Sequence, residues 1–196
     1  MKLSEELKGY EPYNEQEERD KEMMLALLAS SPLIFSRENT SAHMSASAWV
    51  TNKTHDKVLM AYHNIYDSWA WTGGHADGEE DLFAVAEREV REETGIKTLT
   101  PVSNDIFSIE VLTVDGHYKN GKYVSSHLHL NVTYLFEADE TEALRIKADE
   151  NSKVGWFTLD GCIEACNEPW MNQWIYKKLN EKLNEMGLVG LLTENS

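Results

Sequence analysis

Cysteine is scarce in this chain of 196 residues, and long apolar runs are missing. The two cysteines, Cys162 and Cys166, lie one helical turn apart in the segment CIEAC. This spacing suits neither a disulfide framework nor, without further thiols, a closed zinc site. We therefore expect two free thiols and a cytoplasmic protein. No apolar run is long enough to span a membrane, and the acidic first segment is unlike a secretory signal or a transit peptide.

Basic residues are also few. The chain has 18 Lys and Arg against 34 Asp and Glu, which gives a formal net charge of −16. A surface that binds nucleic acid normally carries a stripe of Lys and Arg, and this sequence shows none. We expect no nucleic-acid or membrane partner. A small phosphorylated substrate is still compatible with the charge, because divalent cations reverse its sign locally.

The chain is expected to form one domain with a full core, since hydrophobic residues make up 41% of it and no repeat or low-complexity segment interrupts it. The pattern predicts a helix over 14–30 and an amphipathic helix over 169–188. Between them, Asp81 is expected to cap a helix that ends at Gly95. Such a mixture of strands and helices favours an α/β sandwich. The strands are expected at 45–51, 57–63, 106–114, 126–136 and 153–159.

The segment LFAVAEREVREETG has an apolar stripe that turns into a charged one. At the helical period, Leu82, Val85 and Ala86 form the apolar part of the stripe. The same stripe continues in three carboxylates: Glu89, Glu92 and Glu93. Carboxylates at this spacing repel one another, and their burial is costly unless a cation lies among them. The pattern favours a metal site, and the alternative is a charged helix end that faces water.

The wider window GHADGEEDLFAVAEREVREETGI, from Gly74 to Ile96, resembles the Nudix box. That motif reads G-x5-E-x7-R-E-U-x-E-E-x-G-U, with U aliphatic, and every specified position matches. A chance match in a chain of this length has a probability well below about one in a million. The resemblance implies the Nudix fold, an α/β (α+β) class in which an α/β/α sandwich surrounds a mixed central β-sheet. The resemblance covers roughly residues 40–160. We expect a domain over 40–196 that ends in a helix, with residues 1–39 as a helical extension packed on it.

The same resemblance implies a hydrolase that uses Mg²⁺ or Mn²⁺ to cleave a nucleoside diphosphate linked to another moiety. ADP-ribose, nucleotide sugars and nucleoside triphosphates are substrates of this type. Hard divalent cations prefer oxygen ligands. Arg88 is expected to pair with a box glutamate and fix its rotamer. The implied metal ligands are the Gly74 carbonyl, Glu80, Glu89, Glu92 and Glu93, and the implied catalytic residues are Arg88, Glu89, Glu92 and Glu150.

Two roles stay open between alternatives. The family takes its general base either from the box or from a glutamate in a late loop, and Glu150 in KADENSKVGW lies just before a strand, where such a loop would be. The alternative for Glu150 is a solvated carboxylate. Tyr66, Trp69 and Trp71 precede the box and are candidates to stack on a base or sugar of the substrate, with core packing as the alternative.

Four histidines form a second pattern. In SSHLHLNVTYLF, strand alternation places His127 and His129 on one face, about 7 Å apart and within reach of one ion. Isopentenyl-diphosphate isomerase, a sister family within the Nudix fold, builds a metal site from two histidines and a pair of carboxylates on a strand. His43 and His75 resemble its two histidines, and His127 and His129 fall where the carboxylates would lie. We therefore hypothesise an additional site for Zn²⁺, Mn²⁺ or Fe²⁺; the alternative is four separately hydrogen-bonded or exposed histidines.

Other functions are weighed against hydrolysis. An isomerase is disfavoured, because that family carries a catalytic cysteine where this chain has Gly73. A non-catalytic Nudix module that senses a nucleotide is the main alternative, although such modules usually have lost box glutamates or adjoin a DNA-binding domain. RNA substrates rank lower because of the net charge. A homodimer is expected only because it is common in relatives.

Overall fold

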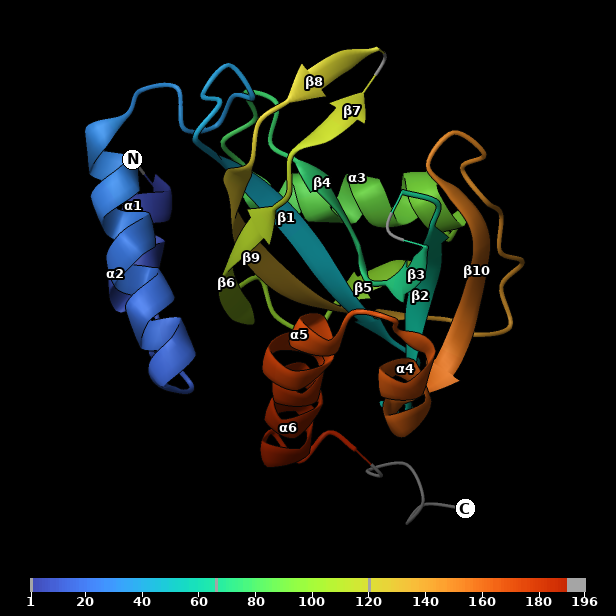
Figure 1. The fold of residues 1–196 in the computed structure, drawn as a ribbon. Coiled ribbons are helices and arrows are strands. Elements are labelled where there is room, and N and C mark those ends of the chain that lie inside the picture. The colour runs from blue at the N-terminus through green and yellow to red at the C-terminus, as the bar shows by residue number, and fades with distance from the viewer. Residues whose placement is uncertain (1, 66, 120, 190–196) are drawn as a thin grey trace.

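A mixed β-sheet forms the centre of the molecule (Figure 1). The computed structural model describes residues 2–65, 67–119 and 121–189. Its strands are β1 (Ala42–Thr51), β2 (Lys57–His63), β3 (Ser68–Ala70), β4 (Thr72–His75), β5 (Leu99–Pro101), β6 (Ser108–Val114), β7 (His117–Lys119), β8 (Lys122–Val124), β9 (His127–Ala138) and β10 (Asn151–Thr158). The main order is β10-β2-β1-β9-β5, while β3 pairs with β2, β4 with β1 and β6 with β9. β7 and β8 form a separate hairpin.

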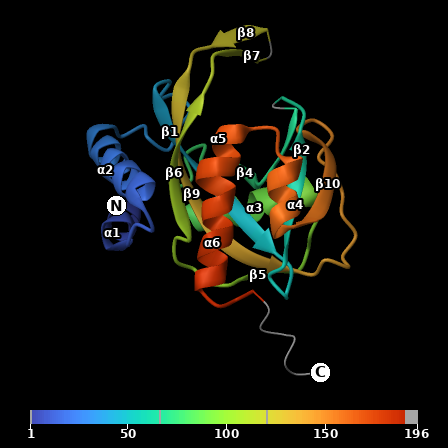
Figure 2. The ribbon, with the colours of Figure 1, turned by 60° about the horizontal axis from the view of Figure 1, so that its bottom comes forward.

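Helices cover both faces of this sheet. They are α1 (Lys2–Gly9), α2 (Glu15–Ser30), α3 (Leu82–Thr94), α4 (Leu159–Ala165), α5 (Pro169–Met171), the π-helix η1 (Asn172–Tyr176) and α6 (Lys177–Glu185). α4, α5 and α6 lie in front of the sheet and α3 lies behind it (Figure 2). The predicted α/β/α sandwich with a mixed sheet is therefore confirmed. None of the helices in the described ranges is both long and apolar enough to cross a membrane.

β1 organises the sheet, and all of its residues are buried. It runs parallel to β9 from the pair Ala42–Leu128 to the pair Thr51–Glu137, and antiparallel to β4 and β2. Because side chains alternate along a strand, Met44 and Ala46 face the core beneath α3, while Trp49 faces the core beneath the C-terminal helices. The two faces of β1 therefore belong to two different cores.

Several predicted elements are found close to their expected bounds. α2 begins after Asn14, whose side chain caps it. α3 is capped by Asp81 and ends at Gly95, which has a φ of 75°. The helix expected over 169–188 instead consists of α5, η1 and α6. α1, the β7–β8 hairpin and α4 were not expected from the sequence. α4 carries Cys162, which is a free and buried thiol.

A buried ionic network joins α2 to the C-terminal helices. Glu17 on α2 is fully buried, and its Oε1 lies 3.0 Å from Nζ of Lys178 and 3.2 Å from Nζ of Lys182. Lys178 also lies 3.1 Å from Glu110 on β6. Burial opposes ionisation of Glu17, but the two lysines outweigh it and lower the pKa of Glu17 to about 2 from an ordinary 4.5. The α1–α2 segment is thus fixed to the domain by charge as well as by its buried Leu7.

Glu17→Gln should therefore destabilise the protein by about 3 kcal/mol at neutral pH, because it leaves the largely buried Lys182 without its carboxylate and Lys178 with Glu110 alone. The pKa of Glu17 is lowered on folding, so its stabilisation is complete above about pH 4.5 and is lost as the pH falls toward 2. The free energy of unfolding, measured by urea denaturation across this range, should fall less steeply in the variant. Glu22→Gln breaks the exposed Arg19–Glu22 pair and should cost less than about 0.5 kcal/mol. Equal losses in both variants would contradict the role given to Glu17.

Candidate functional site

Helix α3 carries the acidic stripe to the edge of the sheet. Val85, Ala86 and Val90 are fully buried and fix the face that the helix presents to β1 and β4. One and two turns further along this face lie Glu89 and Glu93, and Glu93 is only 1% exposed. The helix therefore places carboxylates where its packing stripe would otherwise continue into the core.

Three carboxylates come together at this end of α3. Oxygens of Glu89, Glu93 and Glu150 lie within 4.8 Å of one another. Glu150 comes from the loop before β10, and Asn151 anchors that loop by donating from its Nδ2 to the main-chain oxygen of Glu93, at 3.0 Å. Residues more than 50 positions apart in the chain thus form one acidic group. A set of carboxylate oxygens is the donor set that Mg²⁺ and Mn²⁺ prefer.

Glu93 gives the clearest sign that this group suits a cation. Its Oε1 accepts a hydrogen bond from the Gly73 N–H at 3.1 Å, while its Oε2 is buried and has no partner among the described residues. Burial, with added repulsion from Glu89 and Glu150, raises the pKa of Glu93 to about 8. Burial also raises the pKa of Glu89. A cation among these oxygens would supply the missing partner and favour the ionised form of both carboxylates.

Lys147 supplies part of the positive charge near the site. Its Nζ lies 3.0 Å from Glu92 and 3.1 Å from Glu150. Lys147 was not expected from the sequence, because the resemblance that singles out Glu150 in the same loop assigns no role to a lysine. Arg88 donates to Glu89 at 3.1 Å, which is the pairing expected from the sequence.

The other residues proposed from the sequence fall in different places. Glu92 is about half exposed and faces Lys147, and Glu80 lies in the exposed loop before α3, outside the acidic group. Trp71 is 8% exposed and packs edge-on against Tyr176, so its ring is part of a core. Trp69 is more accessible and contacts Phe157. Tyr66 lies outside the described residues.

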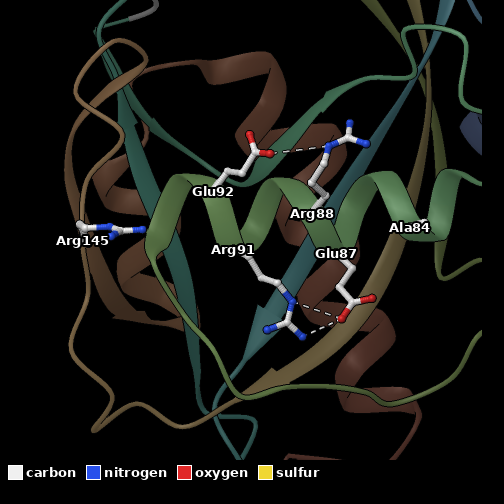
Figure 3. Close-up of a pocket in the computed structure, with 6 residues that line it drawn as sticks. All are labelled: Ala84, Glu87, Arg88, Arg91, Glu92 and Arg145. Carbon is white, nitrogen blue, oxygen red and sulfur yellow. Dashed lines mark hydrogen bonds and ion pairs between the residues drawn. The ribbon is translucent and has the colours of Figure 1, made fainter.

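An open groove of about 430 Å³ runs along the outer side of α3 (Figure 3). Its lining includes Ala84, Glu87, Arg88, Arg91, Glu92 and Arg145. Arg91 is paired with Glu87 at 2.6 Å, so part of the positive charge of the groove is neutralised within it. Of the residues of the acidic site, neither Glu93 nor Glu150 lines this groove.

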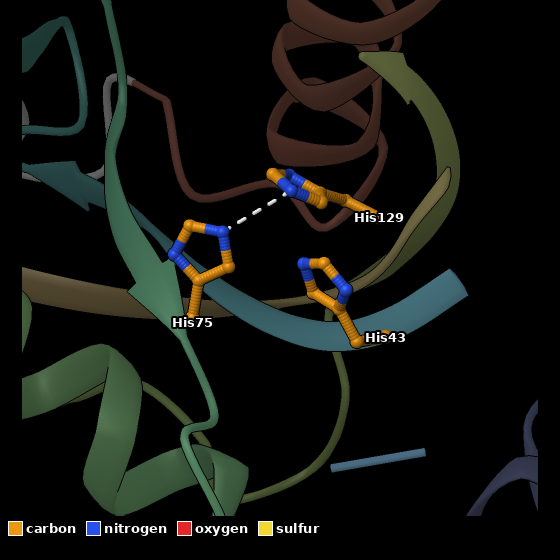
Figure 4. Close-up of side chains that lie close together, drawn as sticks. All are labelled: His43, His75 and His129. Carbon is orange, nitrogen blue, oxygen red and sulfur yellow. Dashed lines mark hydrogen bonds between the residues drawn. The ribbon is translucent and has the colours of Figure 1, made fainter. Parts of the chain in front are cut away.

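The histidines proposed as a second site also come together. One nitrogen each of His43, His75 and His129 lies within 4.8 Å of the others (Figure 4). His127 adjoins them, with its Nε2 at 3.2 Å from Nε2 of His129. His117 is further out, with its ring centre 6.4 Å from that of His127.

Comparison with known proteins shows the family and the fold of the chain. The model of the NUDIX domain family matches residues 41–178. The chain is 27% identical over 114 residues to YvcI of Bacillus subtilis (strain 168), an uncharacterized Nudix hydrolase, and the match covers 57% of this chain and 66% of that protein. A NUDIX-family hydrolase from Clostridium perfringens is similar in structure, with a TM-score of 0.51 and 20% identity over 74% of this chain and 97% of that chain. The C. elegans Ap4A hydrolase binary complex has a TM-score of 0.50 and 19% identity over 73% of this chain and 96% of that chain. The two structural similarities show a shared fold.

The two glycines at the end of β4 allow a direct test of the site geometry. A Cβ on Gly74 would lie 2.5 Å from Cδ of Glu89, whereas a Cβ on Gly73 would lie 2.6 Å from the main-chain oxygen of Ala46. Gly74→Ala should therefore displace the flexible Glu89 side chain and weaken Mn²⁺ binding about tenfold or more, with little loss of stability. Gly73→Ala meets backbone and should cost about 2 kcal/mol of stability.

Mn²⁺ titration by electron paramagnetic resonance and urea denaturation of both variants measure these effects. Unchanged Mn²⁺ affinity in a folded Gly74→Ala protein would contradict the placement of Glu89 in the cation site.

Proposed function

This chain belongs to the NUDIX family, and we infer that it is a divalent-metal-dependent pyrophosphohydrolase of a small nucleotide. The observation that carries this proposal is the buried Glu93, whose Oε2 has no partner among the described residues and lies beside Glu89 and Glu150. Burial of like charges without a cation is unfavourable, and a helix that serves only to pack does not require it. A nucleoside diphosphate linked to another moiety is the proposed substrate class.

The proposed chemistry assigns a separate task to each side chain. Glu89 and Glu93 would hold Mg²⁺ or Mn²⁺, with the exposed Glu92 as a further ligand. When bound, the cation neutralises the phosphate oxygens of the substrate and stabilises the charge that develops on the leaving group. Arg88 would hold the Glu89 carboxylate in place through the contact at 3.1 Å. Family membership, the complete box and the acidic group support this assignment.

Glu150 is the proposed general base. Its carboxylate would accept a proton from the water that attacks phosphorus, while the bond between phosphorus and the bridging oxygen breaks and the leaving group departs with its electron pair. Lys147, at 3.1 Å from Glu150 and 3.0 Å from Glu92, would orient both carboxylates. Trp69 is the proposed contact for a base or sugar, since Trp71 is occupied in a core.

A nucleotide sensor is the competing function. It would need the fold and a nucleotide site, but not three converging carboxylates or a proton acceptor. The acidic group therefore favours the hydrolase.

A hydrolysis panel tests the proposed activity. ADP-ribose, nucleotide sugars, nucleoside triphosphates and dinucleoside polyphosphates should be assayed with Mg²⁺ and with Mn²⁺. We expect metal-dependent cleavage of at least one substrate, and a decrease of about hundredfold or more in kcat/KM for Glu93→Gln. Glu87→Gln is the matched control on the same helix and should keep its rate within about twofold. A folded wild type that binds these nucleotides but cleaves none would support the sensor instead.

Glu150→Gln separates the base from a metal ligand. If Glu150 accepts the proton, kcat should fall about hundredfold or more, while Mn²⁺ affinity and KM change little. Glu142 lies in the same loop and accepts backbone N–H groups of Lys97 and Thr98, so Glu142→Gln serves as the control. A loss of Mn²⁺ affinity in Glu150→Gln, with kcat preserved at saturating metal, would assign Glu150 to the metal and contradict its role as base.

A further inference from the structure

The histidine cluster lies on the face of the sheet opposite α3. His43 on β1 is paired directly with His129 on β9, and His75 on β4 is opposite Ser45 on β1. Gly74, one residue before His75, faces Glu89 on α3. Because neighbouring strand residues point to opposite faces, His75 points away from the acidic site. The cluster is therefore a separate group, built by three strands that meet side by side (Figure 4).

Backbone carbonyls fix the tautomers of two of these rings. Nδ1 of His43 lies 3.0 Å from the oxygen of Asn39, and Nδ1 of His127 lies 2.8 Å from the oxygen of Ser125. A carbonyl oxygen only accepts hydrogen bonds, so each Nδ1 carries the proton and each neutral ring keeps a lone pair on Nε2. Histidines that bind metals commonly donate their other ring N–H in this way. Nε2 of His43, a residue only 4% exposed, has no hydrogen-bond partner among the described residues.

Two distances between imidazole nitrogens of the cluster match the spacing of metal ligands. Nε2 of His129 lies 3.2 Å from Nε2 of His75 and 3.2 Å from Nε2 of His127. Two ligands at about 2.0 Å from a tetrahedral ion are separated by about 3.3 Å. Hydrogen bonding explains this arrangement less well, because His129 has one Nε2 proton at most and two imidazole nitrogens compete for it.

Burial favours the neutral form, which binds metals, in three of the rings. Burial, with the neighbouring imidazoles and Arg37 adding to it, lowers the pKa of His129 to about 2 and that of His75 to about 3. Burial also lowers the pKa of His43. Arg37 is itself paired with Asp77 at 2.6 Å. Neutral imidazoles need not release protons before they bind an ion.

We propose that His43, His75, His127 and His129 form a second metal centre that binds one divalent transition ion, distinct from the carboxylate site on α3. Imidazole nitrogens favour Zn²⁺ or Fe²⁺ over Mg²⁺. The ion joins β1, β4 and β9 next to Gly73 and Gly74, and so stabilises the segment that contacts Glu89. The proposal of this centre does not rest on the proposed hydrolase activity.

The test uses the full chain without a histidine tag, in excess Mg²⁺ so that the carboxylate site is filled. After gel filtration, elemental analysis should find one equivalent of Zn²⁺ in protein supplied with it. Loading with Co²⁺ should give the intense visible absorption of a tetrahedral site. His75→Gln and His129→Gln should each weaken binding at least tenfold and remove this absorption. His117→Gln, at a half-buried neighbour outside the cluster, should bind as tightly as the wild type.

A measurement on the wild type avoids dependence on the folding of the variants. In long-range ¹H–¹⁵N spectra, Zn²⁺ should shift the Nε2 resonances of His43, His75, His127 and His129 and leave those of His55 and His63 in place. Two results overturn the proposal: a wild type that takes up no Zn²⁺ or Co²⁺, and a site that the His75 and His129 substitutions leave intact.

Discussion

A buried carboxylate oxygen that has no partner in the described part of the chain is the constraint on which the acidic site depends. Glu93 is almost fully enclosed at the end of α3, and its ionised form is unfavourable beside Glu89 and Glu150. Three neighbouring residues position this group. Gly73 donates its N–H to Glu93, Gly74 leaves room for Glu89, and Asn151 holds the loop of Glu150 against the helix. Gly74 and Asn151 allow the carboxylates to approach one another, the Gly73 N–H compensates only one oxygen of Glu93, and a divalent cation relieves the remaining repulsion.

The strand β1 explains how the fold presents two chemically different groups so close together. β1 lies between β9 and β4, and its alternating residues belong to opposite faces. Met44 and Ala46 belong to the core beneath α3, whereas His43 belongs to the histidine cluster. β4 has the same arrangement in Gly74 and His75. The carboxylates of the acidic site thus lie on one face and the clustered imidazoles on the other, which suits ions of different softness.

The sequence predicts well what is local. The helical period and the caps Asp81 and Gly95 define α3, and strand alternation places His127 and His129 together. The spacing of the box selects Glu89 and Glu93. Contacts between distant parts of the chain are not predictable in this way: Lys147 reaches the site through a loop, and Trp71 packs in a core. The strands β7 and β8 are too short to show a period in the sequence. Glu80 and Glu92 fit the motif, but the folded chain leaves both side chains exposed, which the motif does not predict.

The most direct test of the account is the position of Mn²⁺ in crystals soaked with this ion and measured by anomalous diffraction. We expect an anomalous peak among the carboxylates, with oxygens of Glu89 and Glu93 at about 2.1 Å from it. The buried Oε2 of Glu93 should be one of them. A well-ordered acidic group with no peak, under conditions in which the protein binds Mn²⁺ in solution, would contradict the assignment of this group as the cation site.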